Sequence, residues 1–234
     1  MNYTNHPSTG SAISPELHQE FKDHVLSSCV NHDFPSTYFS TGIAEECVEF
    51  LDVLNIALNA NSRNLYQADK GKLDTVTYGL MISEAGDILW YLYALSLSLP
   101  GGKFSSTETK FYGKDGNPKP ISFVFDSTTQ ANSNTKSVDA HQLYELKDQL
   151  CSAMGKLCGS VKKFSRGDKS WEIFQARIQK DIYILLQILH DILYLLPKFF
   201  NSPMITFEST MKYNIQKIAL RKSEGKIKGD GENR

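Results

Sequence analysis

Apolar residues recur every three to four positions along several long segments of the sequence, and this periodicity limits the possible folds more than any other feature. Such spacing places the apolar side chains on one face of an α-helix. Helices are expected over residues 15–30, 41–58, 74–99, 143–164, 171–199 and 211–221. Helices with such faces bury them against one another, so the sequence predicts an all-α chain folded as a helical bundle.

The middle of the chain interrupts the helical pattern. There the segment FYGKDGNPKPISFVF has two short β-prone runs around a Gly/Pro/Asn turn, and TTQANSNTK has the composition of a linker. We therefore expect a loop or hairpin insert between two helical halves. The expected divisions are a disordered N-terminus (1–15) and a single domain (16–234), which comprises an acidic half (16–99), the insert (100–140), a second half (141–200) and a C-terminal helix with a basic tail (201–234).

The two halves resemble each other at two places. EECVEF at 45–50 aligns with SAMGKL at 152–157, and GDILWYL at 86–92 aligns with HDILYLL at 190–196. In this register the counterparts of Glu46, Glu49, Glu84 and Asp87 are Ala153, Lys156, Ile188 and Asp191. One interpretation is a duplication, which would make the chain a fused pseudo-dimer of two helix pairs with a degenerate second half. The other is chance similarity between two amphipathic helix pairs.

Two acidic pairs border the apolar faces of the helices in the first half. Glu46 and Glu49 are three residues apart, as are Glu84 and Asp87, so each pair shares one helix face. If these helices pack through their apolar faces, the four carboxylates converge and repel one another unless cations or raised pKa values compensate. Oxygen ligands without histidine or cysteine favour Mg²⁺ or Mn²⁺. Taken alone, either pair would be read as a solvated helix face.

Composition and missing motifs exclude several common functions. The net charge of -1 gives no overall attraction to nucleic acid or to an anionic membrane. The most apolar segments, 88–99 and 182–196, are shorter than the roughly 20 residues that span a bilayer. The four cysteines form no CxxC pair, and the N-terminus lacks a signal-like pattern, so we expect a cytoplasmic protein. No P-loop, GxSxG or strand-linked GxGxxG motif occurs.

Three separate motifs resemble those of a known enzyme family. GIAEECVEF and SEAGDILWYLYALS are similar to the ExxE and ExxD helices of the MazG-like all-α nucleoside triphosphate pyrophosphohydrolases. NIQKIALRKSEGKIKGDGENR resembles the Asn-x-x-Lys-Leu-x-x-Arg tail, with its closing Gly-x-Gly-x-x-Arg, of many MazG-like proteins, although Ile218 replaces the usual leucine. The resemblance covers residues 41–60, 80–99 and 214–234.

The resemblance implies a reaction and a set of site residues. The metal ligands would be Glu46, Glu49, Glu84 and Asp87, which would bind Mg²⁺ or, as an alternative, Mn²⁺. The metal would hold the triphosphate while water attacks the α-phosphorus, which yields a nucleoside monophosphate and pyrophosphate. The residues implied to contact the substrate are Tyr91, Asn214, Lys217 and Arg221. A structural role in the core is the alternative for Tyr91, and Glu45 is either a base or a neighbour in an acidic run.

The function expected from these patterns is the removal of surplus or non-standard (deoxy)nucleoside triphosphates. The family that the motifs resemble includes enzymes that act on dUTP, on dCTP and on broader sets of substrates. Phosphoribosyl-ATP hydrolysis is a related and less favoured alternative. We expect a monomeric pseudo-dimer or a homodimer, without nucleic-acid or membrane partners. The alternative function is that of a catalytically inactive helical scaffold or regulatory binding protein that keeps the carboxylates without turnover.

Overall fold

Six α-helices make up nearly all of the part of the chain that the computed structural model describes, which is residues 13–29, 35–61, 73–98, 111–112, 118–119 and 140–225. The helices are α1 (Pro15–Ser28), α2 (Pro35–Asn61), α3 (Thr75–Ser98), α5 (Ala140–Ser165), α6 (Trp171–Phe200) and α7 (Phe207–Ser223). The predicted all-α class is therefore confirmed.

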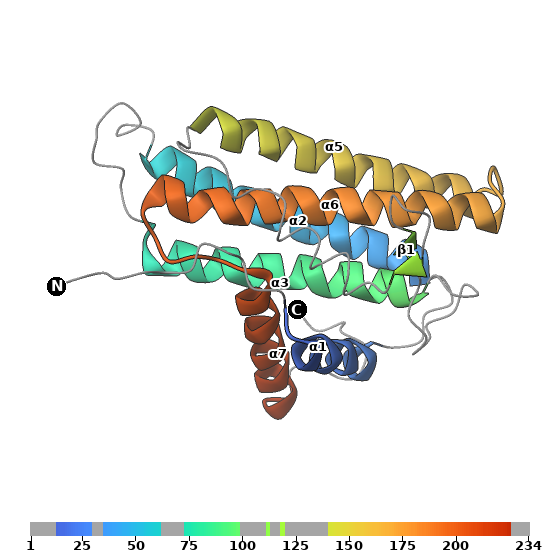
Figure 1. Ribbon diagram of the computed structural model, residues 1–234, viewed down its shortest axis with the longest axis horizontal. Coiled ribbons are helices and arrows are strands. Elements are labelled where there is room, and N and C mark those ends of the chain that lie inside the picture. Colours follow the sequence, from blue (N-terminus) through green and yellow to red (C-terminus); the bar gives the residue numbers. More distant parts are fainter. Residues whose placement is uncertain are drawn as a thin grey trace.

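Four long helices run side by side along the long axis of the molecule (Figure 1). α2 and α3 form one antiparallel pair, α5 and α6 form another, and the two pairs pack together mainly through α2 and α5. The shorter helices α1 and α7 pack against α3 and against each other, and α7 crosses the direction of the long helices (Figure 1). α3 thus contacts other long helices of the bundle as well as α1 and α7.

A short hairpin lies within the segment expected to be an insert. β1 (Phe111–Tyr112) pairs antiparallel with β2 (Pro118–Lys119), so that Phe111 is opposite Lys119. The sequence predicted a hairpin or a loop here, and the structure shows a hairpin whose second strand lies within the expected Gly/Pro/Asn turn. The TTQANSNTK segment lies outside the described residues.

Two helices begin four or more residues earlier than their apolar periodicity predicted. α2 starts at Pro35 rather than near residue 41, because proline fits the first turn of a helix and the buried Phe39 adds one turn to the apolar face. α7 starts at Phe207 rather than at 211, because Thr206 and Ser209 form a reciprocal capping box. Helix starts thus depend on capping residues that lie outside the apolar repeat.

The described chain begins with a capped helix. The Ser14 hydroxyl accepts a hydrogen bond from the Leu17 amide, and Pro15 opens α1. Ile13 is buried in the core. The folded part therefore begins no later than Ile13, within the segment 1–15 that was expected to be disordered, and residues 1–12 lie outside the described residues.

Among the described helices, α6 alone is long and apolar enough to cross a bilayer by length and composition. In its most apolar 18-residue window, 61% of the residues are buried against the rest of the protein. The central helix of a bundle meets the same length and composition criteria, because it is apolar on most of its surface.

Candidate metal and substrate site

Three carboxylates meet where α2 packs against α3. Glu46 projects from the middle of α2, and Glu84 and Asp87 project from α3; one ligand oxygen from each lies within 4.8 Å of the others. The two helices are held together by fully buried apolar side chains around these acids. These include Ile43, Cys47 and Phe50 of α2 and Ala85, Ile88 and Leu89 of α3. The structure thus brings together three of the four acids that the motif spacing singled out.

Burial makes this group of acids unusual. Glu46 is 0% exposed and Asp87 is 8% exposed, whereas Glu84 is partly buried. Burial, followed by the negative charges of Asp87 and Glu49, raises the pKa of Glu84 to about 7, against the opposing effect of Lys217. Near neutral pH, Glu84 therefore exchanges between its protonated and ionised forms.

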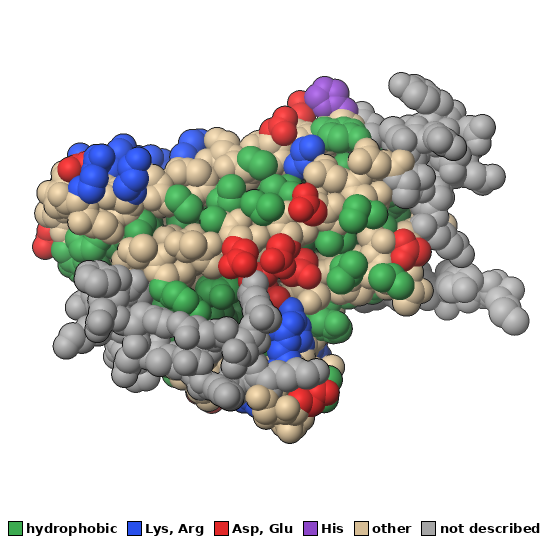
Figure 2. All heavy atoms as spheres, turned by 180° about the vertical axis from the view of Figure 1, so that it is seen from behind, with side chains coloured by type: hydrophobic (Ala, Val, Ile, Leu, Met, Phe, Trp, Pro, Cys, Tyr) green, Lys and Arg blue, Asp and Glu red, His purple; other side chains and the backbone are tan. Residues whose placement is uncertain are grey.

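The two neighbouring acids of α2 lie at the rim of this group. Glu49 is exposed, and its charge raises the pKa of Glu84, so it lies beside Glu84 but outside the group of three. Glu45 is also exposed, and its charge acts on Tyr91. Figure 2 shows acidic side chains gathered in the middle of the face that is turned away from the viewer in Figure 1.

Helix α7 supplies the groups that neutralise Asp87. The Asn214 amide nitrogen donates a 2.7 Å hydrogen bond to Asp87 Oδ1, and Lys217 Nζ donates to Asp87 Oδ2. Lys217 Nζ also donates to the Ser83 hydroxyl at 2.9 Å. Burial raises the pKa of Asp87, although Lys217, Arg221 and Asn214 act in the opposite direction. Three of the four residues implied to contact substrate therefore act on the same carboxylate.

The close approach of α7 depends on a glycine of α3. A Cβ atom at Gly86 would lie 3.0 Å from the Thr210 carbonyl oxygen and 3.1 Å from Asn214 Cβ. Any larger residue would have to push α7 away from α3. Gly86 immediately precedes Asp87, and its lack of a side chain lets Asn214 and Lys217 of α7 reach the Asp87 carboxylate.

Tyr91, the fourth of these residues, lies one turn beyond Asp87. Its ring covers Gly42 of α2, where a Cβ atom would come within 2.3 Å of Tyr91 Cε1. Burial, followed by interactions with Tyr38, Glu45 and Asp87, raises the pKa of the Tyr91 hydroxyl. The ring therefore packs between helices while its hydroxyl faces the acidic rim.

Three further residues belong to the site but were not singled out by the sequence. Ser83 contacts Lys217, Tyr38 lies beside Tyr91 with ring centroids 6.3 Å apart, and His24 of α1 interacts with Asn214. Burial lowers the pKa of His24 to about 4, so its imidazole is neutral at pH 7. Only Ser83 had a usable signal, because it precedes Asp87 by one helical turn and shares its face.

The donor set fits a hard divalent cation. Mg²⁺ binds oxygen at about 2.0 to 2.1 Å, so two ligands on opposite sides of the ion are about 4.2 Å apart. The three carboxylate oxygens lie within 4.8 Å of one another, so side-chain movement could bring them onto a single ion. Each Asp87 oxygen already accepts one hydrogen bond but keeps a second lone pair for a metal.

In total, the site combines three clustered carboxylates, a fourth at the rim, and a lysine and an amide from a crossing helix. Such a set can bind a cation and a phosphate group side by side. The part of the C-terminal motif beyond Gly225 lies outside the described residues. Comparisons with protein-family models, with curated proteins and with solved structures found no match for this chain.

Proposed function

We propose that this protein is a MazG-like, Mg²⁺-dependent hydrolase that converts nucleoside or deoxynucleoside triphosphates to monophosphates and pyrophosphate. The observation that carries the proposal is the meeting of three motifs at one place. Asp87 of the second motif hydrogen-bonds Asn214 of the third, 127 residues later, and lies beside Glu46 of the first. Proximity of segments so distant in sequence is expected if they form one site.

Glu46, Glu84 and Asp87 would hold the cation, and Glu49 at the rim is placed to complete its ligands or to orient a water molecule. A bound Mg²⁺ supplies charge neutralisation and a lower pKa for a bound water. The chain's own task is then to fix these carboxylates. The α2–α3 packing does this for Glu46 and Glu84, and Asn214 does it for Asp87.

Cationic side chains of α7 would bind the phosphates. Lys217 Nζ has three donor hydrogens, of which the described contacts with Ser83 and Asp87 use two. Its remaining hydrogen is available to a phosphate oxygen. Arg221 is partly buried one turn further along, and its positive charge already acts on Asp87. Tyr91 and Glu45 border the same space and would contact the bound substrate or its water.

We also propose that the chain is a fused pseudo-dimer. α2 and α5 run in opposite directions, as do α3 and α6, as a two-fold axis across the bundle would require (Figure 1). Several apolar positions matched by the repeat are buried in both halves. The matched pairs include Ile43 with Leu150, Phe50 with Leu157, Leu54 with Val161, Met81 with Leu185, Ile88 with Ile192, and Leu92 with Leu196.

The degenerate half supports the same proposal. Gln149, Asp191 and Leu195 line one pocket between α5 and α6. In the repeat register these are the counterparts of Gly42, Asp87 and Tyr91, which lie together in the acidic half. The second half would therefore retain the shape of the site with one of its four acids, Asp191, and without counterparts of Glu46, Glu49 and Glu84.

The test is pyrophosphate release from a panel of standard, deoxy and modified nucleoside triphosphates, with Mg²⁺, Mn²⁺ or EDTA. We expect metal-dependent release with a preference for one base. Asp87→Asn and Glu49→Gln should each lower the rate by at least about a hundredfold, since even groups that only orient metal ligands contribute 10- to 100-fold.

Asp52→Asn is the matched control, because it removes a negative charge from an exposed position of α2 and should leave the rate unchanged. Circular dichroism and gel filtration would show that each variant is folded. Release that persists in EDTA or in Asp87→Asn would contradict the metal role. No release from any triphosphate would contradict the hydrolase proposal and favour the inactive scaffold.

A further inference from the structure

A second polar site, separate from the acidic site, lies where α5 ends and α6 begins. A pocket of about 370 Å³ opens between the last turns of α5 and the first turns of α6, which is within the size range of small-molecule sites. Four cationic side chains line it, namely Lys156, Lys163, Lys169 and Arg177. Lys and Arg side chains gather at this end of the molecule (Figure 2).

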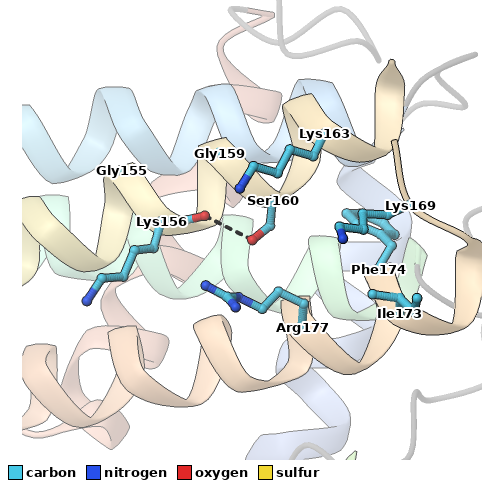
Figure 3. Close-up of a pocket in the computed structure, with 9 residues that line it drawn as sticks. All are labelled: Gly155, Lys156, Gly159, Ser160, Lys163, Lys169, Ile173, Phe174 and Arg177. Carbon is cyan, nitrogen blue, oxygen red and sulfur yellow. Dashed lines mark hydrogen bonds between the residues drawn. The ribbon is translucent and has the colours of Figure 1, made fainter. Parts of the chain in front are cut away.

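The cations that line this basic pocket come from α5, from α6 and from Lys169 in the turn between them. Figure 3 shows Lys163 of α5 and Arg177 of α6 on either side of Ser160, with the Lys163 amino group above it and the Arg177 guanidinium below it. Arg177 Nε lies 3.6 Å from Asp181, a buried carboxylate that the Ser160 hydroxyl also contacts at 2.8 Å. The other three cations form no ion pair with another described residue. The pocket therefore keeps an excess of about three positive charges.

Two glycines create the open space. Gly155 and Gly159 lie one turn apart on the α5 wall of the pocket, and a Cβ atom at either would contact nothing within 4 Å. Packing therefore does not require glycine at these positions, although glycine is less favourable than alanine inside a helix. Because these two residues have no side chains, the α5 wall of the pocket is open to a ligand.

The remaining wall is apolar. Ile173 is 55% exposed at the pocket, and Phe174 beside it is held by stacking on Phe164, with ring centroids 4.1 Å apart. A ligand of this pocket would thus combine several negative charges with a flat apolar part. Phosphates fit the guanidinium and amino groups, and a nucleobase fits the surface of Ile173 and the glycine backbone.

We propose that the basic pocket binds a nucleoside triphosphate as a non-substrate ligand, with its phosphates on Lys163 and Arg177 and its base against Ile173. This site uses none of the acids at the α2–α3 contact. It needs no metal, because its own cations neutralise the phosphates. A second nucleotide site in the acid-poor half gives the protein a means to sense the nucleotide pool.

The test is titration calorimetry of the full-length protein with ATP in EDTA, which prevents metal-dependent binding at the acidic site. We expect saturable binding of one ATP per chain. Lys163→Gln should weaken binding roughly tenfold or more, as expected for the loss of a charge-assisted hydrogen bond. Gly159→Leu should abolish binding without a change of charge, because the leucine fills the pocket.

Lys162→Gln is the matched control, since it removes the same charge from the adjacent exposed position of α5, outside the pocket. Equal losses in Lys162→Gln and Lys163→Gln would overturn the proposal and indicate unspecific attraction. Inorganic triphosphate that binds as tightly as ATP would exclude a nucleoside subsite. A thymidine oligonucleotide that binds more tightly than ATP would identify the surface as a polynucleotide groove instead. A Glu49→Gln variant that binds ATP normally in EDTA but lacks hydrolysis would show that the two sites are separate.

Discussion

The carboxylates of the acidic site differ in how they are neutralised. Asp87 has an amide and an ammonium partner from α7. Glu84 has two acidic neighbours, and its pKa is about 7. Without a bound cation, ionisation of Glu84 is therefore unfavourable in the folded protein, and the site is a point of weakness until a cation binds.

The stability of the metal-free protein should consequently depend on pH through Glu84. Its folded pKa of about 7 lies above the ordinary value of 4.5, so the folded state binds this proton more tightly than the unfolded state. The stabilisation is complete below pH 4.5 and is lost as the pH rises to 7. In EDTA, Glu84→Gln should raise the Tm above pH 7 and flatten this dependence in thermal melts. The exposed-site control Asp52→Asn should follow the wild-type curve; a Glu84→Gln curve that also does so would refute the prediction.

Removal of the lysine partner should be costly. In Lys217→Met, the largely buried Asp87 loses its ammonium partner. Loss of one partner of a buried ion pair typically costs roughly 3 kcal/mol of unfolding free energy. Lys212→Met is the control on the same helix, because its pair with Glu208 is exposed and should contribute less than about 1 kcal/mol. Urea unfolding measures both, and equal losses would show that the Asp87 pair is not specially buried.

At the scale of elements, the contact between α3 and α7 sets the geometry of the site. Gly86 lets the α7 backbone approach so closely that Asn214 reaches Asp87. The two helices cross rather than run alongside each other (Figure 1). One position therefore controls the distance between the acids and the neutralising groups.

Gly86→Ala should destabilise the protein although alanine is the better helix former. The helix gains about 0.5–1 kcal/mol, but the contacts with Thr210 and Asn214 force a shift that costs about 1–3 kcal/mol. Gly79→Ala on the same helix meets nothing within 4 Å and should be stabilising. Denaturant unfolding of both variants tests this, and stabilisation by Gly86→Ala would show that α7 adjusts freely.

The elements and the acids were predictable to different degrees. Apolar periodicity located every described helix, because it reflects which face is buried, and spacing along α2 and α3 singled out the acids. The starts of α2 and α7 were missed, because Pro35 and the Thr206 cap lie outside the apolar repeat. His24 and Tyr38 were missed because their place depends on how helices pack, which no local pattern encodes.

For the whole molecule, ligand binding should raise the free energy of unfolding. Mg²⁺ with a nonhydrolysable triphosphate, each at saturating concentration, should raise the unfolding free energy by about 2.7 kcal/mol when the ligand is at one hundred times its Kd. Differential scanning calorimetry measures this. Asp87→Asn should remove the metal-dependent part of the shift, and a wild type that shows no shift would favour the inactive scaffold.

The position of α7 in the chain has a consequence for biosynthesis. Residues 46–87 leave the ribosome well before Asn214 and Lys217, so the acids exist for a time without the groups that neutralise Asp87. A translation product that stops before α7 would never gain the side chains that contact Asp87. Truncated chains should therefore be poor at folding and readily degraded, which would keep incomplete copies from accumulating.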